Sequence, residues 1–214
     1  MMLTGAARAD TTAVYGTANG KFSMTIKIAS NGDIHGEVPG TNYYFVGGTD
    51  YFVDRSASGV MVMRLDDVAK VMSERYVEMA AKIGTTSPTP PIITLVRKGD
   101  ASIKQWSGEA YYMQSKTGQT SPRPVAVISH TASLAELGRA MQRQFEKSEV
   151  LMSQISGGRA PTSNLNEILR SGAPISFANA ELQTVSFDPI PKSEFVLPAR
   201  PASLEDVRKH ISLH

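Results

Sequence analysis

The side chains best suited to proton transfer or metal binding are four histidines: His35, His130, His210 and His214. None lies in an H-E-x-x-H zinc motif. His35 follows a predicted turn and His130 ends a predicted strand, so we interpret both as surface residues. His210 and His214 lie four residues apart near the chain end. They would bind a metal weakly there, but a frayed terminus is the preferred interpretation. The sequence therefore predicts no metal site.

Two pairs of aspartates are close enough in the sequence to be candidates for acid/base chemistry. Asp50 and Asp54 flank an aromatic strand segment and are expected on one face, where a carboxylate pair could act as acid and base. Aspartates at strand edges usually face solvent, so we interpret them as surface residues. Asp66 and Asp67 open a predicted helix, where they complement its dipole. Neither pair predicts a catalytic site.

Other motifs of catalysis are absent from the sequence. It has no G-x-S-x-G elbow, no P-loop and no G-x-G-x-x-G fingerprint. It also has no cysteine, which excludes disulfides, thiolate metal ligands and cysteine nucleophiles. The sequence predicts a protein that is not an enzyme, with no catalytic residue and no cofactor.

The charge and hydropathy of the chain indicate whether it binds nucleic acid or spans a membrane. The chain has 22 Lys and Arg against 20 Asp and Glu, a net charge of only +2, and the basic residues are scattered. A nucleic-acid site would need a clustered basic face, so no nucleic-acid partner is expected. No stretch of the sequence approaches the ~18 apolar residues of a membrane helix.

The first half of the chain has the pattern of a β-meander followed by a helix. Between 22 and 28, apolar and polar residues alternate with the period of a half-buried strand. Asn19-Gly20 and Asn31-Gly32 flank it with hairpin turns. Five strands are predicted, at 22–28, 34–38, 42–46, 51–55 and 60–63. An apolar stripe of helical period then predicts a helix along 65–83, capped by Gly84.

The second half predicts further strands around a second long helix. A Pro-rich loop is expected at 85–91, and a turn at Lys98-Gly99-Asp100. Ser133 and Glu136 form the pattern of a capping box that starts the second helix, which Gly157 ends. A short helix at 164–170 stops at Gly172. The predicted strands are 92–96, 103–106, 109–114, 125–128, 175–178, 182–187 and 195–197, and a last helix covers 204–211.

Aromatic residues and methionines recur along the predicted strands and helices. Methionine is flexible and suits surfaces that receive apolar partners of variable shape. These residues either fill the core or line an apolar cavity on the concave face of a curved sheet, beneath helices. The candidate cavity residues are Phe22, Met24, Ile26, Phe52, Met63, Trp106 and Met141.

The order of these elements resembles the LolA-like periplasmic lipoprotein-carrier fold over most of residues 12–200. Three segments support the resemblance: 108–112, 134–141 and 169–198, the last ending on a P-x-x-x-F-x-x-P phrase. The resemblance implies an incomplete barrel lidded by helices, with a cavity for acyl chains. Carriers of that family also use an arginine on an early strand to control the lid. The early strands here offer Lys21 and Lys27, so no functional residue is carried over.

We therefore predict an α+β fold. A curved antiparallel sheet, an incomplete barrel, has two long and one or two short helices on its concave side. The predicted function is a non-enzymatic carrier or binding protein for a lipid, an acylated protein or another apolar guest, in peripheral contact with the cell envelope. An envelope protein–protein interaction module with a filled core is the alternative. An enzyme built on His35, Asp50 and Asp54 ranks third.

The N-terminal residues suggest a location. Residues 1–6 form a short stretch of apolar and small side chains, and Ala7-Arg8-Ala9 matches the A-x-A rule of signal peptidase cleavage. They predict the tail of a truncated secretory signal, followed by one domain at 10–214, in a periplasmic or secreted protein. An ordinary disordered N-terminus is the alternative.

Overall fold

A computed structural model describes residues 9–56, 59–83, 93–155 and 164–212. In it, eleven strands form one antiparallel sheet in the order β6-β5-β4-β3-β2-β1-β11-β10-β9-β8-β7. The strands are β1 (Thr11–Gly16), β2 (Ser23–Ile28), β3 (Ile34–Val38), β4 (Thr41–Val46), β5 (Thr49–Ser56), β6 (Gly59–Arg64), β7 (Thr94–Ile103), β8 (Trp106–Gln114), β9 (Ala126–Ser129), β10 (Ala173–Phe177) and β11 (Ala180–Ser186). The α-helices are α1 (Leu65–Ile83), α2 (Ala135–Ile155), α3 (Leu165–Leu169) and α4 (Leu204–Ser212).

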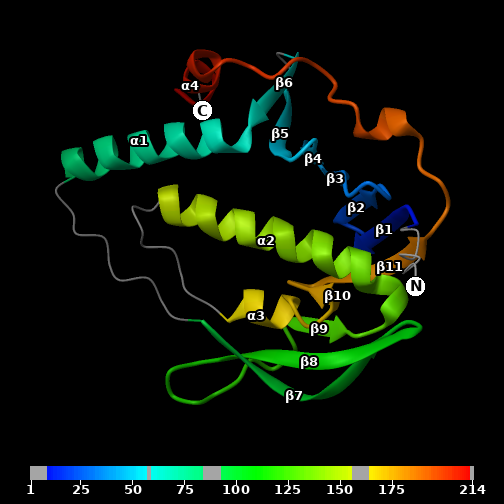
Figure 1. The fold of residues 1–214 in the computed structure, drawn as a ribbon. Coiled ribbons are helices and arrows are strands. Elements are labelled where there is room, and N and C mark those ends of the chain that lie inside the picture. The colour runs from blue at the N-terminus through cyan, green and yellow to red at the C-terminus, as the bar shows by residue number, and fades with distance from the viewer. Residues whose placement is uncertain (1–8, 57–58, 84–92, 156–163, 213–214) are drawn as a thin grey trace, which may run out of the picture.

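The sheet is open and curves around the two long helices (Figure 1). Strands β6 and β7 are its two edges, so it does not close into a barrel. Helix α2 packs on β1, β2 and β10, and α1 packs on β5, β6 and α2. The short helices α3 and α4 lie beside α2 and α1, respectively. The predicted α+β fold with a curved, open sheet is confirmed.

Strand β1 joins the two halves of the sheet, and the sequence analysis did not predict it. It pairs with β2 on one side and with β11 on the other. Its residues alternate between buried and half-buried, with Ala13 and Tyr15 in the core. The strand is short and rich in Thr, Ala and Gly, so its alternation is weak in hydropathy even though its burial is regular.

The main core lies between α2 and the sheet. Leu134 precedes α2 in a 3-10 turn, Ala132–Leu134, and packs with Leu137 and Met141 of the helix against strands from both halves of the sheet. Each such buried aliphatic side chain contributes about 1.5–3 kcal/mol to folding. The helix therefore starts through a 3-10 turn that contains Ser133, rather than with Ser133 as the cap before it.

The segment after β11 covers the convex face of the sheet, opposite to the helices. It holds a 3-10 turn, Lys192–Phe195, and Leu197 packs there on Tyr44, Val53 and Val62. We call 188–203 the strap. Ala202 donates its backbone N–H to the Val62 carbonyl at 2.8 Å, where the strap reaches β6.

Three local predictions of strands and turns were wrong. The expected strand at 195–197 is part of the strap, whose flanking Pro191 and Pro198 each lack the N–H needed to pair as a strand. The expected turn at Lys98-Gly99-Asp100 is a bulge inside β7, and the hairpin turns at Lys104 instead, which has a positive φ of 52°. The expected strand at 103–106 is therefore interrupted by this hairpin turn, with residue 103 ending β7 and residue 106 starting β8.

Some predictions fall on residues that the structure does not describe. The signal tail at 1–9 lies outside the described residues except for Ala9. The loop at 85–91, the expected helix ends at Gly84 and Gly157, and His214 also lie outside them. Among the described helices, none is both long and apolar enough to cross a membrane.

Candidate binding cavity

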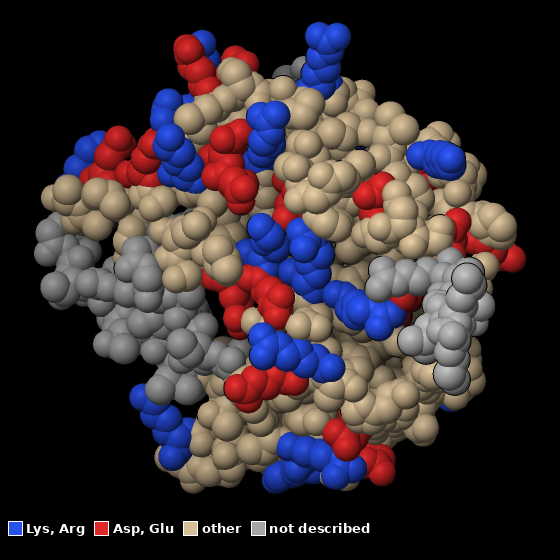
Figure 2. Space-filling view, in the orientation of Figure 1, with Lys and Arg blue, Asp and Glu red and all other residues tan. Residues whose placement is uncertain are grey.

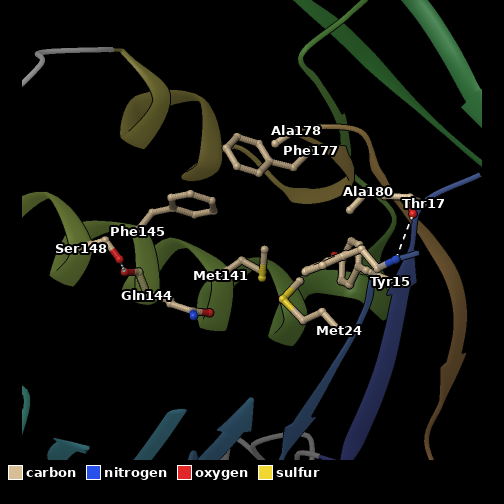
Figure 3. A pocket seen from close by; sticks show the side chains of 11 residues that line it. Tyr15, Thr17, Met24, Met141, Gln144, Phe145, Ser148, Phe177, Ala178 and Ala180 are labelled. Atoms are coloured by element: carbon tan, nitrogen blue, oxygen red, sulfur yellow. Dashed lines mark hydrogen bonds between the residues drawn. The ribbon is translucent and has the colours of Figure 1, made fainter. Parts of the chain in front are cut away.

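A first cavity of about 310 Å³ lies between α2 and the middle of the sheet. No charged side chain is among the described residues that line it. Met24 and Met141 point toward one another across it, and the Phe145 and Phe177 rings meet at its far wall (Figure 3). Its lining residues are Tyr15, Thr17, Phe22, Met24, Met141, Gln144, Phe145, Ser148, Phe177, Ala178 and Ala180.

Packing within the sheet and between helix and sheet fixes the walls of this cavity. The Phe145 and Phe177 rings pack edge to face, with centroids 4.7 Å apart. Tyr15 is buried, and its hydroxyl donates to the Pro174 carbonyl at 2.6 Å. Burial raises the pKa of Tyr15, so the hydroxyl stays neutral and brings no charge into the cavity.

A second cavity of about 250 Å³ adjoins the first along α2. The two share Met24, Gln144 and Ser148 as walls. The second cavity extends toward β3, β4 and β5 and reaches the start of α1 at Leu65. Its other lining residues are Ile26, Gly36, Val38, Thr41, Asn42, Tyr43, Phe52, Lys147 and Leu151.

A third cavity of about 560 Å³ lies between α1, α4 and strands β5 and β6. Phe52 is a wall of both the second and the third cavity. Three mostly apolar cavities therefore follow one another across the concave face. The remaining walls of the third are Met63, Val68, Met72, Arg75, Tyr76, Met79, His210 and Ile211.

The periods of the strand and of the helix explain why these residues line the cavities. On the β2 side, Phe22, Met24 and Ile26 alternate with polar residues and so share the concave face. On α2, Met141, Gln144, Ser148 and Leu151 recur at spacings of three and four, which places them on one stripe of the helix. The strand period and the helix period thus bring two rows of side chains to face each other.

Six of the seven predicted cavity residues line these cavities. Phe22 and Met141 line the first, Met24 the first two, Ile26 the second, Phe52 the second and third, and Met63 the third. Trp106 does not line any of the three. It starts β8 directly after the β7–β8 hairpin turn and packs, half-buried, on the main core. That the six residues bind a guest stays a prediction.

Several walls of the cavities are not among the residues predicted from the sequence. Phe145 lies four residues after Met141 on the same helical stripe, so helical periodicity alone predicts its position. Tyr15 belongs to the unpredicted strand β1. Phe177 lies in a predicted strand, but only the packing of β10 against α2 brings it to the cavity.

Asp50 is buried, contrary to the expectation that it faces solvent. Its Oδ2 accepts from Arg143 at 3.1 Å and lies 3.4 Å from the Lys147 Nζ, both on α2. The Tyr43 hydroxyl donates to its Oδ1. Asp54 bonds instead to His210 of α4, at 2.8 Å. The two aspartates thus tie strand β5 to two different helices.

His35 is also buried, although it was expected at the surface. It lies under the strap on the convex face, stacked on Tyr44 with ring centroids 4.1 Å apart. His130, by contrast, is exposed as expected, and a ring nitrogen is 2.7 Å from the Ser171 carbonyl oxygen. Since Asp50 points to α2 on the other face of the sheet, the candidate residues of an enzyme are not brought together.

One group of side chains among the described residues has the spacing of a metal site: His35, Glu37 and Glu194. The Lys27 Nζ lies between its carboxylates, 2.9 Å from Glu37 and 2.7 Å from Glu194. Although burial opposes it, bonding to these carboxylates raises the pKa of Lys27. A protonated ammonium already bridges both carboxylates, so we interpret the group as a tie between strap and sheet.

Comparisons of the chain with models of known protein families, with characterised proteins and with solved structures give no match. The function proposed below is therefore argued from the cavities and from the sequence.

Proposed function

We propose that this chain is a non-enzymatic binding or carrier protein for an apolar guest, for which a lipid or acyl chain is the best fit. The observation that supports it is the run of three adjoining cavities on the concave face, with mostly apolar walls. Ligand sites in proteins have volumes of roughly 300–1,000 Å³ and mostly apolar linings. The first two cavities together fall in that range.

The walls also suit a flexible guest. Five methionines line the three cavities: Met24, Met63, Met72, Met79 and Met141. Methionine side chains adapt to irregular apolar shapes. A linear arrangement of small cavities, joined through shared walls, fits an extended hydrocarbon chain better than a compact ring system. Burial of each methylene of such a chain contributes about 0.8 kcal/mol.

The setting of this function is part of the proposal. The A-x-A phrase near the N-terminus and the resemblance to LolA-like carriers favour a periplasmic or secreted protein. Its partners would then be lipids or acylated proteins of the envelope. No catalytic step is assigned to it.

An interaction module is the second candidate. Exposed apolar side chains lie near the C-terminal ends of both long helices, on α1 at Val77 and Met79 and on α2 at Val150 and Met152. Exposed apolar residues of this kind suit a protein partner. We rank this candidate second because it expects a filled core, and the space beneath α2 is not filled.

A blocked cavity tests the proposal. Ser148 is an exposed wall of both the first and the second cavity. In the variant Ser148→Phe, the ring occupies the space where the two cavities meet. We expect calorimetric titration with dodecanol, a neutral single chain, to show binding to the wild type and at least about tenfold weaker binding to this variant, a loss of ~1.4 kcal/mol.

The control is Gln154→Phe, at an exposed position of the same helix that lines none of the three cavities. It should bind dodecanol as the wild type does. If the wild type binds no dodecanol, or if both variants bind it equally well, the cavity is not the site and the interaction module becomes the better account.

A further inference from the structure

One charged side chain stands at the rim of the apolar space beneath α2. Lys147 is the only charged residue among the described walls of the second cavity, and the first has none. Its side chain lines the second cavity and is 38% exposed to solvent. Figure 2 shows Lys and Arg side chains over the middle of this face, where α2 lies, with Asp and Glu side chains between them.

At this rim, two positively charged side chains share a single negatively charged partner. Lys147 and Arg143 both approach the same oxygen of Asp50, at 3.4 and 3.1 Å, so two cations share one carboxylate. Burial, followed by the bond to Asp50, raises the pKa of Tyr43, so that its hydroxyl adds no negative charge. The next acid along the helix, Glu146, is paired with Arg170 at 3.3 Å.

The Arg143 side chain is fixed more firmly than that of Lys147. Its guanidinium lies 3.5 Å from the centre of the Phe45 ring and donates to Asp50. Its Nε is buried without a hydrogen-bond partner. Asp50 would therefore keep Arg143 and Tyr43 as partners if Lys147 turned toward another anion. If the lysine changes partners, the buried Asp50 carboxylate is still compensated by the Arg143 guanidinium, so no buried charge is left unpaired.

We infer that the guest is a single-chain amphiphile with an anionic headgroup, and that Lys147 receives this headgroup at the cavity rim while the chain enters the apolar space between α2 and the sheet. This inference rests on the proposed function and names its ligand class. Arg143 adds positive potential behind the lysine. A carboxylate and a phosphate monoester share the required chemistry, a compact anion at the end of one hydrocarbon chain.

The test compares four ligands with the same chain: dodecanol, dodecanoate, dodecyl phosphate and dodecyltrimethylammonium. Each is titrated calorimetrically into the wild type and into Lys147→Met, Lys147→Arg and Lys70→Met. Methionine keeps the length of the apolar stem, and arginine keeps the charge. Lys70 is an exposed lysine of α1 that lines none of the three cavities, so its variant is the matched control.

We expect the wild type to bind at least one anionic ligand about fivefold to tenfold more tightly than dodecanol, and the ammonium ligand more weakly. High salt should reduce this preference. In Lys147→Met the ratio of anion affinity to dodecanol affinity should fall to about one, whereas Lys147→Arg and Lys70→Met should keep the ratio of the wild type. Tighter binding of dodecanoate would indicate a fatty acid as the guest, and tighter binding of dodecyl phosphate would indicate a phosphorylated chain.

Two results would overturn the inference while leaving the cavity proposal intact: equal affinity of the wild type for dodecanol and both anions, or an anion preference that Lys147→Met retains. A wild type that binds none of the four ligands would overturn both, since dodecanol depends on the apolar walls alone.

Discussion

At the residue scale, the ion group on the convex face makes a pH-dependent contribution to stability. Burial lowers the pKa of His35, with Glu37 acting in the opposite direction, so the ring is neutral in the folded protein at neutral pH. The charged groups that face it are Lys27, Glu37 and Glu194. In the unfolded chain, the same ring takes up a proton near its ordinary pKa of ~6.5.

The sign of the effect follows from this difference. As the pH falls through about 6.5, the unfolded chain binds a proton that folded His35 does not, and the free energy of unfolding decreases. We expect a loss of up to ~1.4 kcal/mol per pH unit from this residue between about pH 7 and its lowered folded pKa. The variant His35→Gln keeps a donor and an acceptor for Asn42. Its free energy of unfolding, measured by urea denaturation at each pH, should depend less steeply on pH than that of the wild type.

Glu194 of the same group acts in a lower pH range. Bonding to Lys27 lowers the pKa of Glu194, so its contribution persists above the ordinary range of glutamate titration and is lost below it. If the free energy of unfolding of His35→Gln falls as steeply as that of the wild type between about pH 7 and 5, this account of His35 is contradicted.

Sequence reasoning failed at His35 and Asp50 for the same physical reason. Strand periodicity correctly places His35 and Ile34 on opposite faces of the sheet, and Asp50 and Phe52 on the same face. It does not reveal what covers each face. The strap, more than 150 residues along the chain, buries His35, and the cations of α2 make burial of Asp50 tolerable. Such long-range partners are not encoded in local spacing.

At the element scale, two glycines allow the chain to pass close to the short strand β9. A Cβ at Gly108 would lie 2.3 Å from the Ile128 carbonyl oxygen, and one at Gly172 would lie 2.3 Å from that of Ser129. Gly138 of α2 in turn faces Gly172, with 3.1 Å between its added Cβ and the Gly172 carbonyl carbon. Small residues therefore set how closely the helix and the sheet approach at this point.

We expect Gly172→Ala to destabilise the protein by about 2–3 kcal/mol, since the methyl group meets backbone that cannot move without breaking pairing. The matched control is Gly36→Ala in β3, where the nearest atoms to an added Cβ lie at 3.8 Å. Urea denaturation measures both. Equal stabilities of the two variants would show that the close approach at Gly172 does not constrain the fold.

Most elements could be predicted from local pattern, and the exceptions have local causes. The hairpins from β2 to β6 follow from alternation and Gly-containing turns, and α1 and α2 follow from their apolar stripes. Strand β1 escaped because Thr, Ala and Gly give little alternation in hydropathy. The bulge in β7 resembled a turn because Gly99 has the positive φ that turns also use, 74°.

At the scale of the whole molecule, the sheet curves around more space than its own side chains fill. The sequence supplied many of the cavity walls, because strand and helix periods are local. It could not tell whether those walls meet or leave a gap, since that depends on how α2 sits on β1, β2 and β10. Trp106 shows the limit, as an aromatic residue of the right type that packs on the core outside the three cavities.

The central claim is that a hydrocarbon chain occupies this space, and a series of primary alcohols of increasing length tests it most directly. Calorimetric titration should show affinity rising by roughly threefold to fourfold per methylene, or ~0.8 kcal/mol, until the adjoining cavities are full. Beyond that length the affinity should level off. Affinities that do not change with chain length, or an absence of binding at every length, would contradict the claim.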